Sequence, residues 1–248
     1  MSLSASTLPS IIASKKWFGF DLDDTLHEFR KASAQASQSV FESIHAQYGI
    51  GIDSLKSSYS QVLQTTTAGA FTDGRTSTDY RRERFTRLLQ THGINDANQD
   101  TDVESLLTIY KSSLKSSLAL KAGALSFLRA IQDRGKKIIV VTEGPADAQE
   151  WTIRELGLEP LVDVAVTTNE IGKSKVEGLF SIVLYKYDIN REEIIYFGDN
   201  AIRDIKASQE EGIVAVLYDE KQNNQLSDKF SLRINSWKAM QDILELES

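Results

Sequence analysis

The chain of 248 residues contains no cysteine. This absence excludes a disulfide, a catalytic thiolate and a cysteine-based zinc site, and it fits a reducing compartment. Histidine is also scarce, and the spacing of His27, His45 and His92 offers no set of zinc ligands. No stretch reaches the roughly 20 consecutive apolar residues that a membrane-spanning helix needs. The sequence therefore predicts a protein that makes no membrane contact.

The N-terminal segment lacks the features of a signal peptide. Residues 1–15 are rich in serine, with no charged region before their apolar residues and no long apolar run. We interpret this segment as a flexible tail and expect the protein to be cytoplasmic.

Basic residues are fewer than acidic residues, so the chain has a net charge of −7 and a pI near 5.1. An acidic surface of this kind repels a nucleic-acid backbone, so a nucleic-acid polymer is not an expected partner. One basic cluster, Arg81, Arg82, Arg84 and Arg87, alternates with apolar residues at helical spacing. We interpret it as the solvated face of an amphipathic helix.

Short apolar runs without polar alternation predict strands that are buried on both faces. They lie at residues 17–20, 138–141, 162–166, 194–197 and 213–217. Segments with helical periodicity separate them, and a last strand near 230–234 precedes a C-terminal helix. This alternation predicts an α/β fold with a doubly wound, Rossmann-like parallel sheet.

The stretch from residue 27 to residue 118 has no convincing buried strand and is rich in polar residues on helical patterns. We predict an all-helical cap domain at residues 29–118, inserted into a core formed by residues 16–28 and 119–248. The threonine- and glycine-rich residues 65–78 are expected to form a loop between its helices.

Polar residues follow three of the predicted strands. Asp21 and Asp23 follow the first strand, Thr142 the second, and Asp199 a later one, with Asp204 five residues further on. Ligands of open parallel sheets bind at the carboxyl ends of the strands, so these side chains are expected to converge. Two carboxylates about 4 Å apart repel by roughly 4 kcal/mol at an effective dielectric near 20. The crowding predicts a divalent cation, and Mg²⁺ suits such oxygen ligands.

These motifs resemble, in order, those of the haloacid dehalogenase-like superfamily. The first motif is Asp21-Leu22-Asp23-Asp24-Thr25-Leu26, the second is Thr142, the third is a lysine, and the fourth is Gly198-Asp199-Asn200 with Asp204. The resemblance extends from residue 16 to about residue 217, and the helical insertion is similar to the family's type I cap. It implies a magnesium-dependent phosphatase that acts on a small phosphorylated metabolite of the nucleotide or sugar-phosphate type.

The resemblance also implies residue roles. Asp21 would attack phosphorus and become an aspartyl-phosphate. Asp23 would protonate the leaving oxygen and later activate water, while its backbone carbonyl binds the metal together with Asp21, Asp199 and Asp204. Thr142 and the lysine would bind the phosphoryl oxygens.

Two positions depart from the family pattern. The third motif offers Lys173 and Lys175, and family spacing favours Lys175 although Val176 replaces the usual proline. Glu143 stands where relatives often carry asparagine, so an additional anionic side chain is expected beside the bound substrate. His27 follows the first motif and is interpreted as an ordinary polar loop residue rather than one that faces substrate.

Three other functions share parts of this pattern. A dehalogenase is disfavoured because its ester to carbon needs no proton donor such as Asp23. A phosphomutase would share all four motifs. A catalytically silent binding or regulatory protein stays open because of Glu143.

Overall fold

The computed structural model describes residues 8–66, 71–95, 99–220 and 232–245. Within these residues, six strands form one parallel sheet in the order β3-β2-β1-β4-β5-β6. The strands are β1 (Trp17–Phe20), β2 (Lys137–Thr142), β3 (Val164–Thr167), β4 (Ile194–Gly198), β5 (Val214–Tyr218) and β6 (Arg233–Ile234). The central strand β1 therefore has β2 on one side and β4 on the other.

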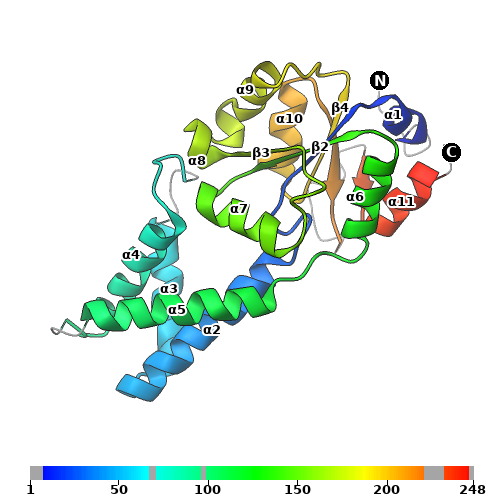
Figure 1. Cartoon of the computed structure of the whole chain (residues 1–248). Helices are drawn as coiled ribbons and strands as arrows, with labels where there is room; N and C mark the ends of the chain where they lie inside the picture. The colour runs from blue at the N-terminus through cyan, green and yellow to red at the C-terminus, as the bar shows by residue number, and fades with distance from the viewer. Residues whose placement is uncertain (1–7, 67–70, 96–98, 221–231, 246–248) are drawn as a thin grey trace.

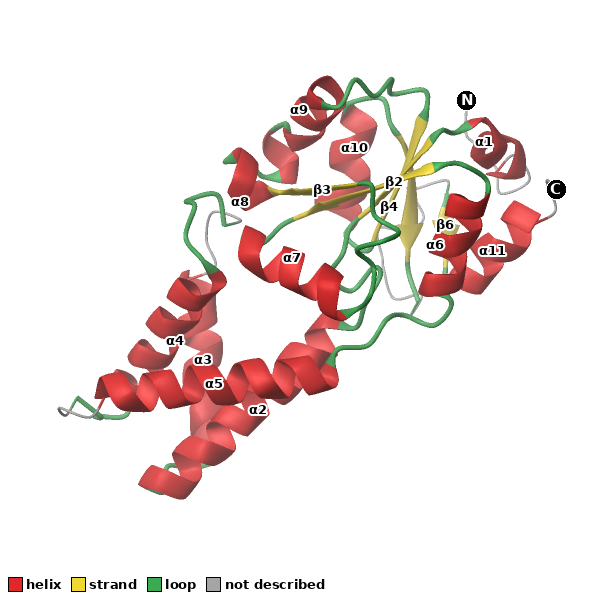
Figure 2. Cartoon of the chain, viewed as in Figure 1, coloured by secondary structure: helices red, strands yellow, loops and turns green. Residues whose placement is uncertain are grey.

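Helices cover both faces of this sheet (Figure 2). One face packs against α1 (Leu8–Ser14), α6 (Ala124–Asp133), α7 (Ala146–Glu155) and α11 (Trp237–Glu245). The other face packs against α9 (Leu179–Lys186) and α10 (Ala207–Glu210). This helix–sheet–helix layering confirms the predicted Rossmann-like α/β fold.

Aromatic side chains fill the space between each face and its helices. On the first face, the rings of Phe127 and Trp237 stack with centroids 5.5 Å apart, and both contact Phe20 of β1. On the second face, the rings of Phe180 and Tyr196 meet edge to face at 4.8 Å. Such packing fixes the strands against the helices and hence the positions of the strand ends.

The predicted flexible tail is wrong for residues 8–14, which form α1. Leu8 and Ile12 are four residues apart, so both lie on one face of the helix, and both are buried in the core. The serine-rich composition concealed this short apolar stripe. Residues 1–7 lie outside the described part of the chain.

Four helices follow β1: α2 (Phe29–Tyr48), α3 (Ile52–Thr66), α4 (Ser77–Thr91) and α5 (Gln99–Ser117). We call them the helical insertion. They pack around a hydrophobic cluster of their own that includes Phe41, Phe85 and Tyr110. Figure 1 shows the insertion standing to one side of the sheet, with α7 facing it.

The chain enters and leaves the insertion through two adjacent segments. The backbone N–H of Glu28 donates to the carbonyl of Ala119 at 2.9 Å, and that of Lys121 donates to the carbonyl of Leu26 at 2.9 Å. Because both connections are joined here, the insertion is anchored next to the carboxyl end of β1.

Several element boundaries differ from the sequence-based prediction. Strand β3 begins two residues later than predicted, and β5 begins one residue later. The last strand was predicted near 230–234, and β6 covers residues 233–234 of it. Residues 230–231 lie outside the described part of the chain. The helical segment that follows β4 begins as a π-helix, Ala201–Lys206. No described helix has both the length and the apolar character needed to cross a bilayer.

Candidate active site

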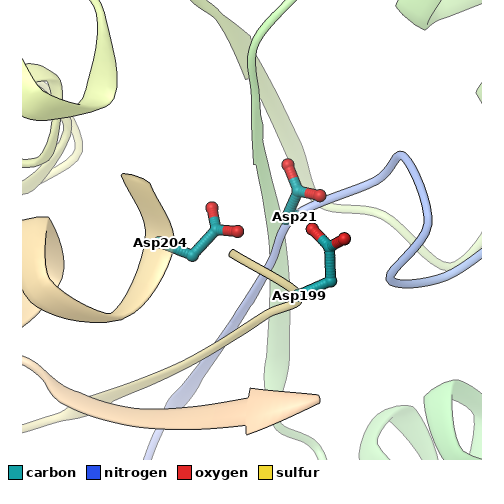
Figure 3. Close-up of side chains that lie close together, drawn as sticks. All are labelled: Asp21, Asp199 and Asp204. Carbon is teal, nitrogen blue, oxygen red and sulfur yellow. The ribbon is translucent and has the colours of Figure 1, made fainter. Parts of the chain in front are cut away.

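Three carboxylates meet at the carboxyl ends of the two central strands. Asp21 directly follows β1, Asp199 directly follows β4, and Asp204 lies in the π-helix that comes next. One oxygen from each carboxylate lies within 4.8 Å of the others. Figure 3 shows the three side chains pointing toward one another. The three predicted aspartates therefore lie together at the edge of the sheet where the carboxyl ends of the strands meet.

The start of the π-helix fixes the position of Asp204. The side chain of Asn200 accepts hydrogen bonds from the backbone N–H groups of Ile202 and Arg203. In turn, the backbone N–H of Asn200 donates to Oδ2 of Asp204 at 2.9 Å. These local bonds hold the Asp204 carboxylate back over the end of β4.

Lys175 lies between two of the carboxylates. Its Nζ is 2.6 Å from Oδ1 of Asp21 and 2.6 Å from Oδ1 of Asp204, and all three side chains are buried. A capping box between Ser174 and Glu177 shapes the short turn that presents Lys175. The alternative lysine of the motif, Lys173, is exposed on the surface.

Burial raises the pKa of Asp21 well above its ordinary value, and repulsion from Asp204 adds to this, while Lys175 acts in the opposite direction. Burial also raises the pKa of Asp199 to about 6, again with a contribution from Asp204. Burial alone would lower the pKa of Lys175, but the two neighbouring aspartates raise it well above its usual range. When all three carboxylates of the cluster are ionised, their negative charge exceeds the single positive charge of Lys175.

The donor set fits a magnesium ion. Asp21, Asp199 and Asp204 offer hard oxygen ligands at mutual distances that one ion can bridge. The Asp23 carboxylate lies outside this group, and the ligand predicted from this residue is its backbone carbonyl. Among the described residues this is the one group of His, Cys, Asp and Glu side chains with such an arrangement.

Asp23 belongs to a second hydrogen-bonded chain. Its Oδ1 lies 2.8 Å from Nε2 of His27, and its Oδ2 accepts from Nε2 of Gln149 at 3.4 Å. Gln149 also accepts from the hydroxyl of Thr142 at 3.2 Å. The chain Thr142–Gln149–Asp23–His27 therefore links the two predicted catalytic side chains, Thr142 and Asp23, and orients both.

The interpretation of His27 as an ordinary loop residue is wrong. The side chain of His27 is fully buried, and its Nδ1 has no hydrogen-bond partner among the described residues. Its spacing of four residues from Asp23 was a signal for this contact. Gln149 gave no such signal, because it reaches the site from α7 through tertiary packing.

Glu143 lies in the site, but its charge is compensated. Oε1 accepts from the backbone N–H of Lys175 at 3.1 Å, and Oε2 pairs with Nη1 of Arg203 at 2.8 Å. A second arginine, Arg30, pairs with Asp24 at 3.1 Å and with Asp199 at 3.2 Å. Neither Arg30 nor Arg203 was predicted from the sequence as a site residue.

A cavity of about 340 Å³ opens over the carboxylates and extends to the helical insertion. A volume of this size suits a small molecule. Its core side is lined by Asp21, Asp23, Asp24, Glu143, Lys175, Asp199, Arg203 and Asp204, and its insertion side by Phe29, Arg30, Ser33, Ser37, Tyr59, Leu63, Phe71, Arg84 and Tyr110.

The basic cluster of α4 is only partly a solvated face. Arg82 and Arg87 are exposed and pair with Glu104 and Glu83, as expected for such a face. Arg84, in contrast, lines the cavity, and Arg81 lies over the ring of Tyr110 at 5.0 Å. The prediction is wrong for these two, because α4 contacts the rest of the insertion on one side and the cavity on another.

The chain has a parallel sheet with this strand order, carboxylates at the ends of the central strands and a helical insertion after the first strand. Together these features are typical of one class of hydrolase. The pattern of haloacid dehalogenase-like hydrolases matches residues 19–218, and the chain belongs to this family.

Named relatives match large parts of the chain. The ribulose-1,5-bisphosphate 5-phosphatase of Halopiger xanaduensis is 24% identical over 212 residues, covering 84% of this chain and 87% of that protein. The glyceraldehyde 3-phosphate phosphatase of Methanocaldococcus jannaschii is 29% identical over 147 residues, covering 57% of this chain and 58% of that protein. The HAD-hydrolase YfnB from Bacillus subtilis, solved with magnesium, shares the fold with a TM-score of 0.71 at 22% identity, with coverage of 93% and 99%.

Proposed function

We propose that the protein is a magnesium-dependent phosphatase that transfers the phosphoryl group of a small phosphomonoester first to Asp21 and then to water. The observation that carries this proposal is the pair of carboxylates Asp21 and Asp23 beside one cavity, each held in a different environment. Asp21 belongs to the charged cluster with Lys175, and Asp23 to the hydrogen-bonded chain with His27. Two of the named relatives, those from Halopiger xanaduensis and Methanocaldococcus jannaschii, are phosphatases.

The two environments suit two different roles. An oxygen of the Asp21 carboxylate forms a bond to phosphorus, and the bond from phosphorus to the leaving oxygen breaks. A protonated Asp23 gives its proton to that leaving oxygen. In the second step Asp23 takes a proton from the water that attacks phosphorus, and the bond from phosphorus to the Asp21 oxygen breaks. Inorganic phosphate leaves, Asp21 is again a carboxylate and Asp23 is again protonated.

Lys175 and Thr142 support the transferring group. The Lys175 ammonium lies at Asp21 and can neutralise charge that develops on the phosphoryl oxygens. The Thr142 hydroxyl, held by Gln149, can turn to donate to one of those oxygens. When bound, Mg²⁺ would be held by Asp21, Asp199, Asp204 and the carbonyl of Asp23, and would neutralise the negative charge shared by the carboxylates and the phosphate.

Phosphate release should depend on a divalent cation. Chelation should lower the rate by about a hundredfold or more, because several kilocalories of charge stabilisation are lost, and added Mg²⁺ should restore it. Phosphate release from p-nitrophenyl phosphate measures this directly. Full activity in excess chelator would contradict the proposal. A sugar phosphate that is converted to its isomer without release of free phosphate would indicate a mutase.

A second prediction concerns Gly198, which lies against Asp204. A Cβ on residue 198 would stand 2.4 Å from both Cβ and Cγ of Asp204, so Gly198→Ala forces that side chain to move. We expect a loss of about 1–3 kcal/mol in the free energy of unfolding. The magnesium concentration for half-maximal activity should rise about tenfold or more.

Gly51→Ala is the matched control, since nothing lies within 4 Å of a Cβ at that position, in the helical insertion. It should leave the magnesium requirement unchanged. An unchanged magnesium requirement in Gly198→Ala would show that Asp204 does not position the metal.

A further inference from the structure

One side of the cavity is built by the helical insertion, and the carboxylates lie on the core side, which we call the other end. Tyr59 of α3, Arg84 of α4 and Tyr110 of α5 form part of its wall, and Phe71 and Leu63 add apolar surface. This end therefore combines a cation with hydroxyl groups in partly apolar surroundings, in contrast to the carboxylates at the other end.

Arg84 is held in a defined orientation. Its Nε donates to the hydroxyl of Thr66 at 3.1 Å, and its guanidinium carbon lies 5.6 Å from the ring centroid of Tyr80 and 6.0 Å from that of Phe71. These contacts come from three segments of the insertion. A guanidinium fixed in this way loses little further freedom when it binds a planar or tetrahedral anion through two parallel hydrogen bonds.

The side chain of Arg84 is partly shielded from solvent. Its side chain is half-buried, and burial lowers the pKa of Arg84 from its ordinary value. Arg81, three residues earlier, adds a second positive charge nearby and hydrogen-bonds Tyr110. Charges interact more strongly in such surroundings than in water, so an anionic ligand gains more here than at an exposed arginine.

The tyrosines at this end can serve as hydrogen-bond donors. Tyr59 and Tyr110 are both buried, and burial raises the pKa of each above its ordinary value. Both hydroxyls therefore keep their protons at neutral pH. Protonated hydroxyls beside an arginine favour an acceptor-rich group over a cationic one.

We propose that Arg84 binds a second anionic group, a carboxylate or a phosphate, at the end of the substrate remote from the phosphate that is cleaved. The protein would then prefer phosphomonoesters that carry two anionic groups at a separation set by the length of the cavity. Which end of the substrate loses its phosphate rests on the proposed function. The preference for ligands with two anionic groups does not depend on it.

Binding of non-hydrolysable probes tests this proposal without turnover. The probes are α,ω-alkane bisphosphonates of increasing chain length, ω-carboxyalkyl phosphonates of the same lengths, and the matching alkyl monophosphonates. Calorimetry in the presence of Mg²⁺ should show one chain length at which a doubly anionic probe binds about tenfold to a hundredfold more tightly than the monophosphonate. The comparison of the two doubly anionic series identifies the second group as phosphate or carboxylate.

Arg84→Gln should abolish this preference and leave the affinity for monophosphonates unchanged. Arg82→Gln removes the same charge from the exposed face of the same helix and should change neither affinity. Arg84→Lys keeps the positive charge but not the planar guanidinium, so it should retain part of the preference. This variant replaces Arg84→Gln in the test if the glutamine variant does not fold.

The wild-type protein alone can overturn the proposal. If no doubly anionic probe binds more tightly than its monophosphonate, Arg84 does not bind a second anion. An equal loss of affinity for both kinds of probe in Arg84→Gln would also contradict it. A preference that holds while p-nitrophenyl phosphate is not hydrolysed would contradict the proposed phosphatase instead.

Discussion

Asp21→Asn should lower phosphate release to the background rate, a loss of about 10⁴-fold or more. The substitution keeps the size of the side chain and its place at the end of β1, but the amide is not a nucleophile and has no charge. The buried Nζ of Lys175 keeps its contact with Asp204, so the fold should survive. Phosphate release from p-nitrophenyl phosphate and the circular dichroism spectrum measure the two effects.

Asp53→Asn is the matched control for this variant. Asp53 is exposed on α3 and receives the same chemical change, so its rate should equal that of the wild type. Activity of Asp21→Asn close to that of the control would exclude Asp21 as the nucleophile.

Asp23→Asn should have an effect that depends on the leaving group. An alkyl phosphate leaves as an alkoxide that needs a proton, so its cleavage should slow by about 10²–10⁴-fold. An activated aryl phosphate leaves without help, so its first step should slow much less. An asparagine at this position can still hydrogen-bond His27, which preserves the local geometry.

Single-turnover rates with the two kinds of substrate separate these cases. An equal loss of rate for alkyl and aryl phosphates would mean that Asp23 does not act as the proton donor. The second step should be slow with both substrates, because it needs Asp23 as a base.

The sequence predicted the site residues that sit at strand ends. Asp21, Thr142 and Asp199 each follow a buried apolar run, and parallel pairing brings the ends of those runs to one edge of the sheet. Lys175 was favoured over Lys173 by the family resemblance alone. Its contact with Asp21 spans 154 residues of sequence, a separation over which no local pattern can place a side chain.

Residues that act through tertiary packing escaped prediction. Gln149 contacts Asp23 and Arg84 lines the cavity, and both lie on helices with ordinary periodicity. A polar residue on a helix is predicted to face solvent unless another element is known to cover it. The same limit hid α1, whose apolar residues Leu8, Ile11 and Ile12 contact the core. Helical periodicity predicted which segments form helices, but not which faces of those helices contact other elements.

The most direct test of the account is the identity of the residue that carries the phosphoryl group. Asp23→Asn should accumulate the adduct with an activated aryl phosphate, because attack by water is slow. Borohydride reduction would then convert an aspartyl-phosphate at position 21 to homoserine, which mass spectrometry can locate within the tryptic peptide of residues 17–30. The account predicts this change at Asp21 alone, and a phosphoryl group on a serine, a histidine or Asp24 would contradict it.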